Sequence, residues 1–125
     1  MSREFIELLK RQRAAREIVV KNLNLYLCRI LQIARELDPS AEVYLFGSFA
    51  RGAPRPDSDV DVLVISDATG RDLLSAAMAV DRITAELGVS GVFEIHVATR
   101  ELFERWYRRF IDVMVLARCE APPRG

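Results

Sequence analysis

The chain carries no excess charge of either sign, because eighteen basic residues balance eighteen acidic residues. No global electrostatic field therefore attracts nucleic acid, and any contact with nucleic acid would need a local basic patch. The sequence also lacks a membrane span of about 20 apolar residues and any stretch resembling a signal peptide. We therefore expect a cytoplasmic protein that has no membrane partner.

Cysteine and histidine are scarce, with two cysteines and one histidine among 125 residues. Cys28 and Cys119 both lie in apolar sequence typical of helices, where a buried, reduced thiol is the expected state. Half of the residues are hydrophobic, which favours a packed core over disorder. The length suits one ordinary domain and is too short for two.

A long helix is predicted from Arg3 to Leu37, because apolar residues recur there at steps of three and four. Two asparagines within 21–24 weaken the helix and mark a candidate break. An unbroken helix would overhang the domain and leave Phe5, Leu8 and Leu9 uncovered, which favours self-association. The alternative is a break near 22–24 that folds the first half of the helix back.

The rest of the chain alternates between strand and helix patterns. Strands are predicted at 43–46, 58–65 and 92–98, helices at about 73–87 and 100–117, and a frayed tail at 121–125. Thr69 and Asp72 have the spacing of a capping box before the first of these helices, whose predicted apolar face includes Leu73. Gly88 ends that helix, and Thr99 can cap the last one.

Two features within residues 43–66 point to phosphate and metal chemistry. Gly47-Ser48 follows an apolar strand, and such a tight turn exposes backbone N–H groups that can receive a phosphate. In the next strand Asp59 and Asp61 share one face, about 7 Å apart, while Val60 points into the core. Neighbouring carboxylates repel each other unless they share a hard cation such as Mg2+. A phosphate turn facing a carboxylate pair is what metal-assisted nucleotidyl transfer requires.

The pattern Gly47-Ser48, ten further residues, then Asp59-Val60-Asp61 resembles that of nucleotidyltransferases of the DNA polymerase β superfamily. It looks most like the minimal nucleotidyltransferases of archaea and bacteria. The resemblance implies an α/β fold, with a small palm-like mixed sheet of three or four strands, helices on one face and a long N-terminal helix. It implies one nucleotidyltransferase domain over 1–125, divided into a helical segment (1–38), a catalytic core (41–118) and a tail (119–125).

The resemblance also implies the residues of the site. A third carboxylate is expected on the third strand, and the matching residue is Glu94, where the family more often has aspartate. The implied catalytic residues and metal ligands are Asp59, Asp61 and Glu94, holding two Mg2+ ions, with Mn2+ as the alternative. The implied nucleotide-binding residues are Gly47, Ser48, Arg51 and Ser58.

Two of the neighbouring side chains have alternative roles. Arg51 could steady phosphate charge, or it could hold the motif loop by pairing with Asp57 or Asp59. His96 lies two residues beyond Glu94 and therefore faces the same side of its strand. It could orient a carboxylate or contact a phosphate, and a partly buried histidine with one hydrogen bond is the alternative.

The predicted activity is transfer of a nucleoside monophosphate from a nucleoside triphosphate, with ATP favoured, to an acceptor hydroxyl or phosphate, releasing pyrophosphate. The acceptor is left open between a partner protein and RNA. A rival hypothesis is an antitoxin-like binding or regulatory partner of a small helical protein, because minimal nucleotidyltransferases commonly occur in such pairs. A third hypothesis is a nucleotide-binding protein without turnover.

Overall fold

The computed structural model describes residues 2–55 and 57–119. In chain order its elements are α1 (Arg3–Lys21), α2 (Leu23–Leu37), β1 (Glu42–Phe46), α3 (Gly47–Ala50), β2 (Val60–Ile65), α4 (Leu73–Leu87), β3 (Phe93–Ala98), α5 (Arg100–Leu102), the π-helix η1 (Phe103–Tyr107), α6 (Arg108–Phe110) and β4 (Val115–Leu116). The predicted tail at 121–125 lies outside the described residues. Within them, no helix combines the length and apolarity needed to cross a bilayer.

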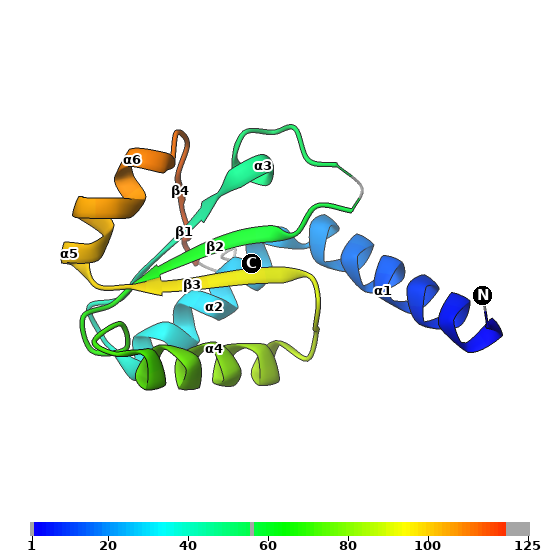
Figure 1. Ribbon diagram of the computed structural model, residues 1–125, viewed down its shortest axis with the longest axis horizontal. Coiled ribbons are helices and arrows are strands. Elements are labelled where there is room, and N and C mark those ends of the chain that lie inside the picture. Colours follow the sequence, from blue (N-terminus) through cyan, green and yellow to red (C-terminus); the bar gives the residue numbers. More distant parts are fainter. Residues whose placement is uncertain (1, 56, 120–125) are drawn as a thin grey trace, which may run out of the picture.

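The four strands form one mixed sheet in the order β3-β2-β1-β4. β2 and β3 run parallel, whereas β1 is antiparallel to both β2 and β4. Helices α2 and α4 cover one face, and the segment α5-η1-α6 lies over one end of the opposite face (Figure 1). The predicted α/β fold with a small mixed sheet is therefore confirmed.

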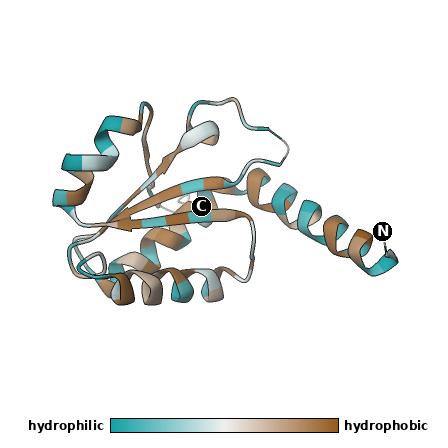
Figure 2. Cartoon of the chain, viewed as in Figure 1, coloured by the Kyte–Doolittle hydropathy of each residue, from teal (hydrophilic) through white to brown (hydrophobic). Residues whose placement is uncertain are grey.

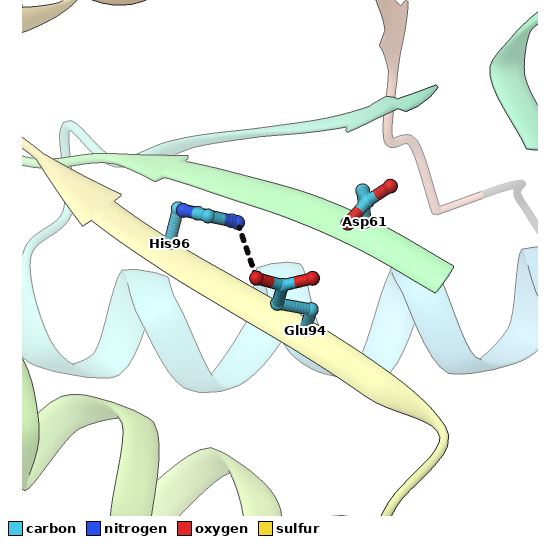
Figure 3. Close-up of side chains that lie close together, drawn as sticks. All are labelled: Asp61, Glu94 and His96. Atoms are coloured by element: carbon cyan, nitrogen blue, oxygen red, sulfur yellow. Dashed lines mark ion pairs between the residues drawn. The ribbon is translucent and has the colours of Figure 1, made fainter. Parts of the chain in front are cut away.

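Strand β2 divides its side chains between two apolar layers. Val60, Val62 and Val64 are buried in the main core beneath α2 and α4, as the alternation of the sequence predicted. Leu63 and Ile65 point to the other face, where the C-terminal segment covers them. Asp61 lies on that second face ahead of the covered part, on the same side as Glu94 and His96 (Figure 3).

The predicted N-terminal helix is broken at Asn22, whose φ of −121° departs from helical geometry. The Asn22 side chain donates to the Ile18 carbonyl at 2.9 Å, and its backbone N–H bonds to the same turn. These bonds close α1 instead of continuing it. The first half does not fold back, however, because α1 projects away from the sheet (Figure 1). Its hydrophobic residues continue out to the N-terminal end (Figure 2), where Phe5, Leu8 and Leu9 are 46%, 50% and 42% exposed.

Three predictions about the later helices are wrong. The last helical stretch ends at Phe110 instead of about Ala117, because Ile111 is extended and Val115–Leu116 pairs with β1 at the sheet edge. An edge strand such as β1 gains backbone hydrogen bonds when another segment pairs with its free side.

The N-terminal cap of α4 differs from the predicted Thr69–Asp72 capping box. Asp72 alone caps the helix, and its carboxylate accepts from the Ser75 N–H at 2.7 Å. Leu73, predicted on the apolar face, is 91% exposed, whereas α4 buries Ala79 and Ile83.

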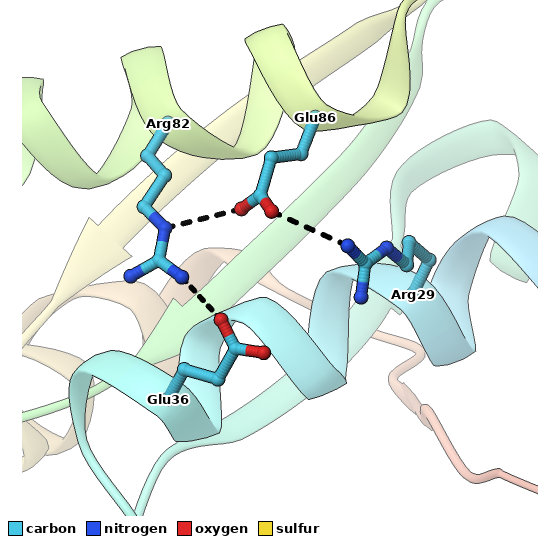
Figure 4. A network of polar contacts seen from close by, with 4 residues as sticks. All are labelled: Arg29, Glu36, Arg82 and Glu86. Carbon is cyan, nitrogen blue, oxygen red and sulfur yellow. Dashed lines mark hydrogen bonds and ion pairs between the residues drawn. The ribbon is translucent and has the colours of Figure 1, made fainter.

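Charged side chains join α2 to α4 along the outer margin of their interface (Figure 4). Glu86 accepts from Arg29 at 3.3 Å and from Arg82 at 3.1 Å, and Arg82 also contacts Glu36. Because these groups are substantially exposed, each pair contributes about 1 kcal/mol or less. The network therefore adds little to total stability.

The two cysteines form a disulfide, so the expectation of free, reduced thiols is wrong. Cys28 on α2 and Cys119 after β4 have their Cα atoms 4.8 Å apart, although 91 positions separate them in sequence. The tail reaches α2 because β4 returns along β1, where the Ala117 N–H donates to the Val43 carbonyl at 2.8 Å. This proximity depends on the strand that the sequence pattern did not reveal.

Reducing the disulfide is expected to lower the free energy of unfolding by about 2–4 kcal/mol, because the bond closes a long loop in the unfolded chain. Urea unfolding with and without dithiothreitol measures the difference. The Cys28→Ser/Cys119→Ser variant is the control, since reductant should leave its midpoint unchanged. Equal midpoints for the oxidised and reduced native protein would contradict a stabilising bond.

Candidate active site

The candidate site is assembled by the register of β2 against β3. Asp61 lies directly opposite Glu94 in this parallel pair, so their side chains emerge next to each other on one face. One ligand atom each from Asp61, Glu94 and His96 lies within 4.8 Å of the others. His96 Nε2 is 3.5 Å from Glu94 Oε1 (Figure 3). Two predicted metal ligands are thus brought together, and His96 joins them.

Electrostatics show that this cluster is short of positive charge. Burial raises the pKa of Asp61 above its ordinary value of 3.8, and the negative charge of Glu94 raises it further, whereas His96 acts in the opposite direction. A divalent cation would relieve this repulsion and favour the ionised carboxylates. The two carboxylates suit Mg2+ and Mn2+, and His96 stands beside them as a further nitrogen donor. The donor set therefore fits the metal that the sequence implied.

Asp59 lies outside this cluster in the structure. Its Oδ1 accepts from Arg16 Nη2 at 3.2 Å, and the same nitrogen donates to the Gly91 carbonyl at 3.0 Å. Arg16 comes from α1, and its Nε is buried with no hydrogen-bond partner among the described residues. Sequence reasoning missed Arg16, because no local pattern links it to a residue 43 positions away.

Removing the Arg16 side chain is expected to strengthen divalent-metal binding two- to fivefold. The guanidinium competes with a cation for Asp59, and a partly exposed ion pair is worth up to about 1 kcal/mol. Calorimetric titration of the Arg16→Ala variant with Mn2+ measures the effect. Arg13→Ala removes a cation from the same helix and should leave the affinity unchanged. Weaker binding by Arg16→Ala alone would show that Arg16 supports the orientation of Asp59.

The Gly47 turn is in direct contact with the carboxylate cluster. Gly47 has a φ of +74°, which favours glycine. A Cβ at this position would overlap Asp61 Oδ2 and lie 3.1 Å from Asp61 Cγ. The carboxylate therefore occupies the space that any larger residue would need. Ser48 follows at the start of the short helix α3 and is partly exposed.

The remaining predicted nucleotide-binding residues hold the motif loop. Ser58 Oγ accepts from the Arg55 N–H at 3.0 Å, which closes the turn before β2. Arg51 Nη1 lies 3.4 Å from Asp112 Oδ1 in the C-terminal segment. Pairing with Asp57 or Asp59, one of the two alternatives for Arg51, is therefore not what the structure shows, because α6 ends beside the Gly47 turn and brings Asp112 to the guanidinium. No pattern in the sequence linked Arg51 to that segment.

Comparison with known proteins identifies the family. The model of the nucleotidyltransferase domain family matches residues 27–117, which include β1, β2, β3 and the clustered carboxylates. The chain belongs to this nucleotidyltransferase family. It is thereby a minimal nucleotidyltransferase of the DNA polymerase β superfamily, as its motif implied. A comparison with curated proteins gives no match.

Solved structures agree on the fold. A crystal structure provisionally described as a nucleotidyltransferase has a TM-score of 0.58 and 28% identity, covering 70% of this chain and 91% of its own. Another with the same description, from Sulfolobus solfataricus, has a TM-score of 0.55 and 21% identity, covering 84% of each chain. A toxin–antitoxin structure with AMP-PNP has a TM-score of 0.42 and 22% identity, covering 57% of this chain and 54% of its own. At that score the likeness says nothing about partners.

Proposed function

We propose that this nucleotidyltransferase moves a nucleoside monophosphate from a nucleoside triphosphate to an acceptor hydroxyl or phosphate and releases pyrophosphate. The observation that carries the proposal is the proximity of two carboxylates and the Gly47 turn. Asp61 and Glu94 are paired across β2 and β3, and the Asp61 carboxylate rests against the Gly47 turn. Carboxylates for a metal and a turn for phosphates thus share one site.

One group of residues would bind the triphosphate, and another would bind the metal ion. The Gly47-Ser48 turn would hold the triphosphate, so that its α-phosphorus lies beside the carboxylates. Asp61 and Glu94, joined by Asp59 on release from Arg16, would hold Mg2+, which supplies charge neutralisation and lowers the pKa of the acceptor oxygen. The acceptor oxygen bonds to the α-phosphorus, and the bond from the α-phosphorus to the oxygen that bridges it to the β-phosphorus breaks and releases pyrophosphate. The proton of a hydroxyl acceptor passes to water.

The test is incubation with each labelled nucleoside triphosphate, ATP first, with candidate protein and RNA acceptors. Parallel reactions contain Mg2+, Mn2+ or a chelator. Label transfer that requires the divalent ion is the expected result. Triphosphate binding without transfer would support the hypothesis of a nucleotide-binding protein without turnover. Transfer-independent capture of a small helical protein would support the antitoxin-like hypothesis.

The cytoplasmic location and the division into 1–38, 41–118 and 119–125 stay predictions.

We also propose that α1 pairs with α1 of a second copy in antiparallel orientation. Its outer half, Arg3–Leu9, exposes Phe5, Leu8 and Leu9 and carries one basic residue against Glu4 and Glu7. The inner half carries an excess of positive charge, from Lys10, Arg11, Arg13, Arg16 and Lys21 against Glu17. Antiparallel pairing places the acidic half of one helix beside the basic half of the other. Parallel pairing would place halves with the same sign of charge beside each other.

Light scattering is expected to show a dimer for the native chain and a monomer for Leu8→Glu, because a buried unpaired charge opposes association. Leu73→Glu makes the same substitution on the exposed side of α4 and should leave the dimer intact. A native chain that stays monomeric at high concentration, or a dimer that survives Leu8→Glu, would contradict pairing through α1. Raised salt should weaken the dimer, since it screens the complementary charges.

A further inference from the structure

A hollow of about 380 Å³ lies beside the carboxylate cluster. One wall is Gly47 and Arg51 of the phosphate turn, and another is His96 of the cluster. Apart from Asp112 at the margin, the rest is aromatic and apolar, supplied by β1 and the C-terminal segment: Phe46, Trp106, Tyr107, Phe110 and Ile111. The proposed phosphate and metal chemistry uses none of these aromatic side chains.

The chain builds this hollow by turning two large aromatic rings outward. Phe103 is buried against Leu63 and Ile65 and fixes the start of η1 on the sheet. From that anchor the segment presents Trp106 and Phe110 to solvent, 57% and 69% exposed, with ring centroids 5.0 Å apart. Packing of the fold does not require such exposure, and π-helical turns are frequent at functional sites. The two rings, whose planes are tilted 53° from each other, therefore form an aromatic platform beside the site.

Polar groups surround this platform in a way that suits a planar, hydrogen-bonding ligand. Arg51 and Asp112 lie 3.4 Å apart at the margin and offer donors and an acceptor. The imidazole of His96 stands edge-on between Phe46 and Tyr107, at centroid distances of 5.3 and 5.9 Å. An apolar pocket with a few convergent polar groups is typical of a small-molecule site.

We propose that this hollow binds the base of the donor nucleoside triphosphate, stacked on one ring of the Trp106–Phe110 platform and in edge contact with the other, because the two ring planes are tilted 53° from each other. The proposal rests on the proposed function, because it takes the phosphates to lie on the Gly47 turn. Gly47 borders both the turn and the hollow, so a nucleotide held by its phosphates has its base within reach of the platform. Every base has a π-face, and stacking on an aromatic side chain is worth about 1–3 kcal/mol.

The other cavity beside the motif loop does not suit a base. It measures about 360 Å³ and lies between α1 and the loop. Its charged lining consists of four cations and one carboxylate, and its aromatic side chain is Phe49. The charged residues are Arg13, Arg16, Lys21, Arg55 and Glu17. Such a cationic wall matches a polyanion and not a planar ring. The aromatic hollow is therefore the better site for the base.

Trp106 is the one tryptophan of the chain, so its fluorescence reports directly on the platform. Mg-ATP is expected to quench it, whereas Mg-tripolyphosphate, which has no base, should bind without a comparable quench. Phe110→Ala should weaken ATP binding about 5- to 150-fold and leave tripolyphosphate affinity unchanged. Leu74→Ala, on the exposed side of α4, is the matched control and should alter neither affinity.

Adenosine separates this proposal from the proposed function. Millimolar adenosine should quench Trp106 in the native chain and equally in Asp61→Asn, which is not expected to catalyse transfer. That quench would support the base site even if no transfer were ever detected. Absence of a quench by both ATP and adenosine would overturn the proposal. So would equal losses of ATP and tripolyphosphate affinity in Phe110→Ala, or a quench produced by oligoadenylate alone, which would assign the platform to an acceptor.

Discussion

The Asp61→Asn variant is expected to lose Mg2+-dependent nucleotidyl transfer by about a thousandfold or more, equivalent to about 4 kcal/mol of transition-state stabilisation. Asp61 contacts both the other metal-ligand candidates and the Gly47 turn of the proposed site. It faces Glu94 across the strand pair, lies in the metal-ligand cluster, and its carboxylate rests against the Gly47 turn. The amide keeps this shape but removes the charge that would hold the cation. Initial rates of label transfer at saturating triphosphate measure the loss.

The same variant should be slightly more stable than the native chain when no metal is present. Burial and the charge of Glu94 raise the pKa of Asp61, so the fold favours its protonated form. Its contribution to stability is therefore complete below about pH 4 and is lost as the pH rises through the raised pKa. At neutral pH the gain in Asp61→Asn should be less than about 1 kcal/mol, because the group is partly exposed.

The control is Asp81→Asn, an exposed carboxylate of α4, which should change neither the transfer rate nor the pH dependence. Urea midpoints with added chelator, compared at pH 4 and pH 7, measure the stability difference. A rate within tenfold of the native rate would remove Asp61 from the catalytic residues. A destabilised variant in chelator would show that the carboxylate supports the fold instead of straining it.

The strands that carry the motif could be predicted because their patterns are local. Alternation along β2 correctly placed Val60, Val62 and Val64 in the core and Asp61 on the opposite face. Thr99 caps the last helical segment as expected, accepting from the Leu102 N–H at 3.1 Å. Each of these predictions depends on residues within a few positions of one another.

Features that arise where a distant part of the chain packs back against the sheet could not be predicted in this way. Val115–Leu116 has no strand signal of its own, and it becomes β4 because β1 offers an open edge. The disulfide follows from that return, since β4 carries Cys119 back towards α2. The break at Asn22 was one of two open alternatives, and the sequence could not show that α1 would still project from the body.

The same difference between local patterns and long-range contacts applies to the candidate site. The strand patterns and the third carboxylate implied by the resemblance placed Asp61 and Glu94 on one face, whereas the parallel register that sets them opposite each other came from the structure. Arg16 and Asp112 reach the site from α1 and from beyond α6, and neither lies in a motif. These two contacts determine where Asp59 and Arg51 point. Side-chain orientation at the site was therefore the part that sequence reasoning could not give.

Replacing Gly47 with alanine is expected to damage stability and activity together. A non-glycine residue at a φ of +74° costs about 1–2 kcal/mol. The new methyl group would also overlap Asp61 Oδ2, so either the carboxylate or the turn must move. Because the proposed chemistry needs both parts in place, transfer should fall at least a hundredfold, as expected when a reacting group is misplaced by about 1 Å.

Gly52→Ala separates the two causes. Gly52 has a φ of +75° in the same loop, and nothing lies within 4 Å of its missing Cβ. It should therefore lose the same 1–2 kcal/mol of stability from backbone strain while keeping most of its transfer activity. A double-mutant cycle with Asp61→Ala tests the overlap itself, because removing the carboxylate should recover part of the stability lost in Gly47→Ala, by about 0.5–3 kcal/mol. Additive losses, or equal rates for Gly47→Ala and Gly52→Ala, would show that the turn and the carboxylate act independently.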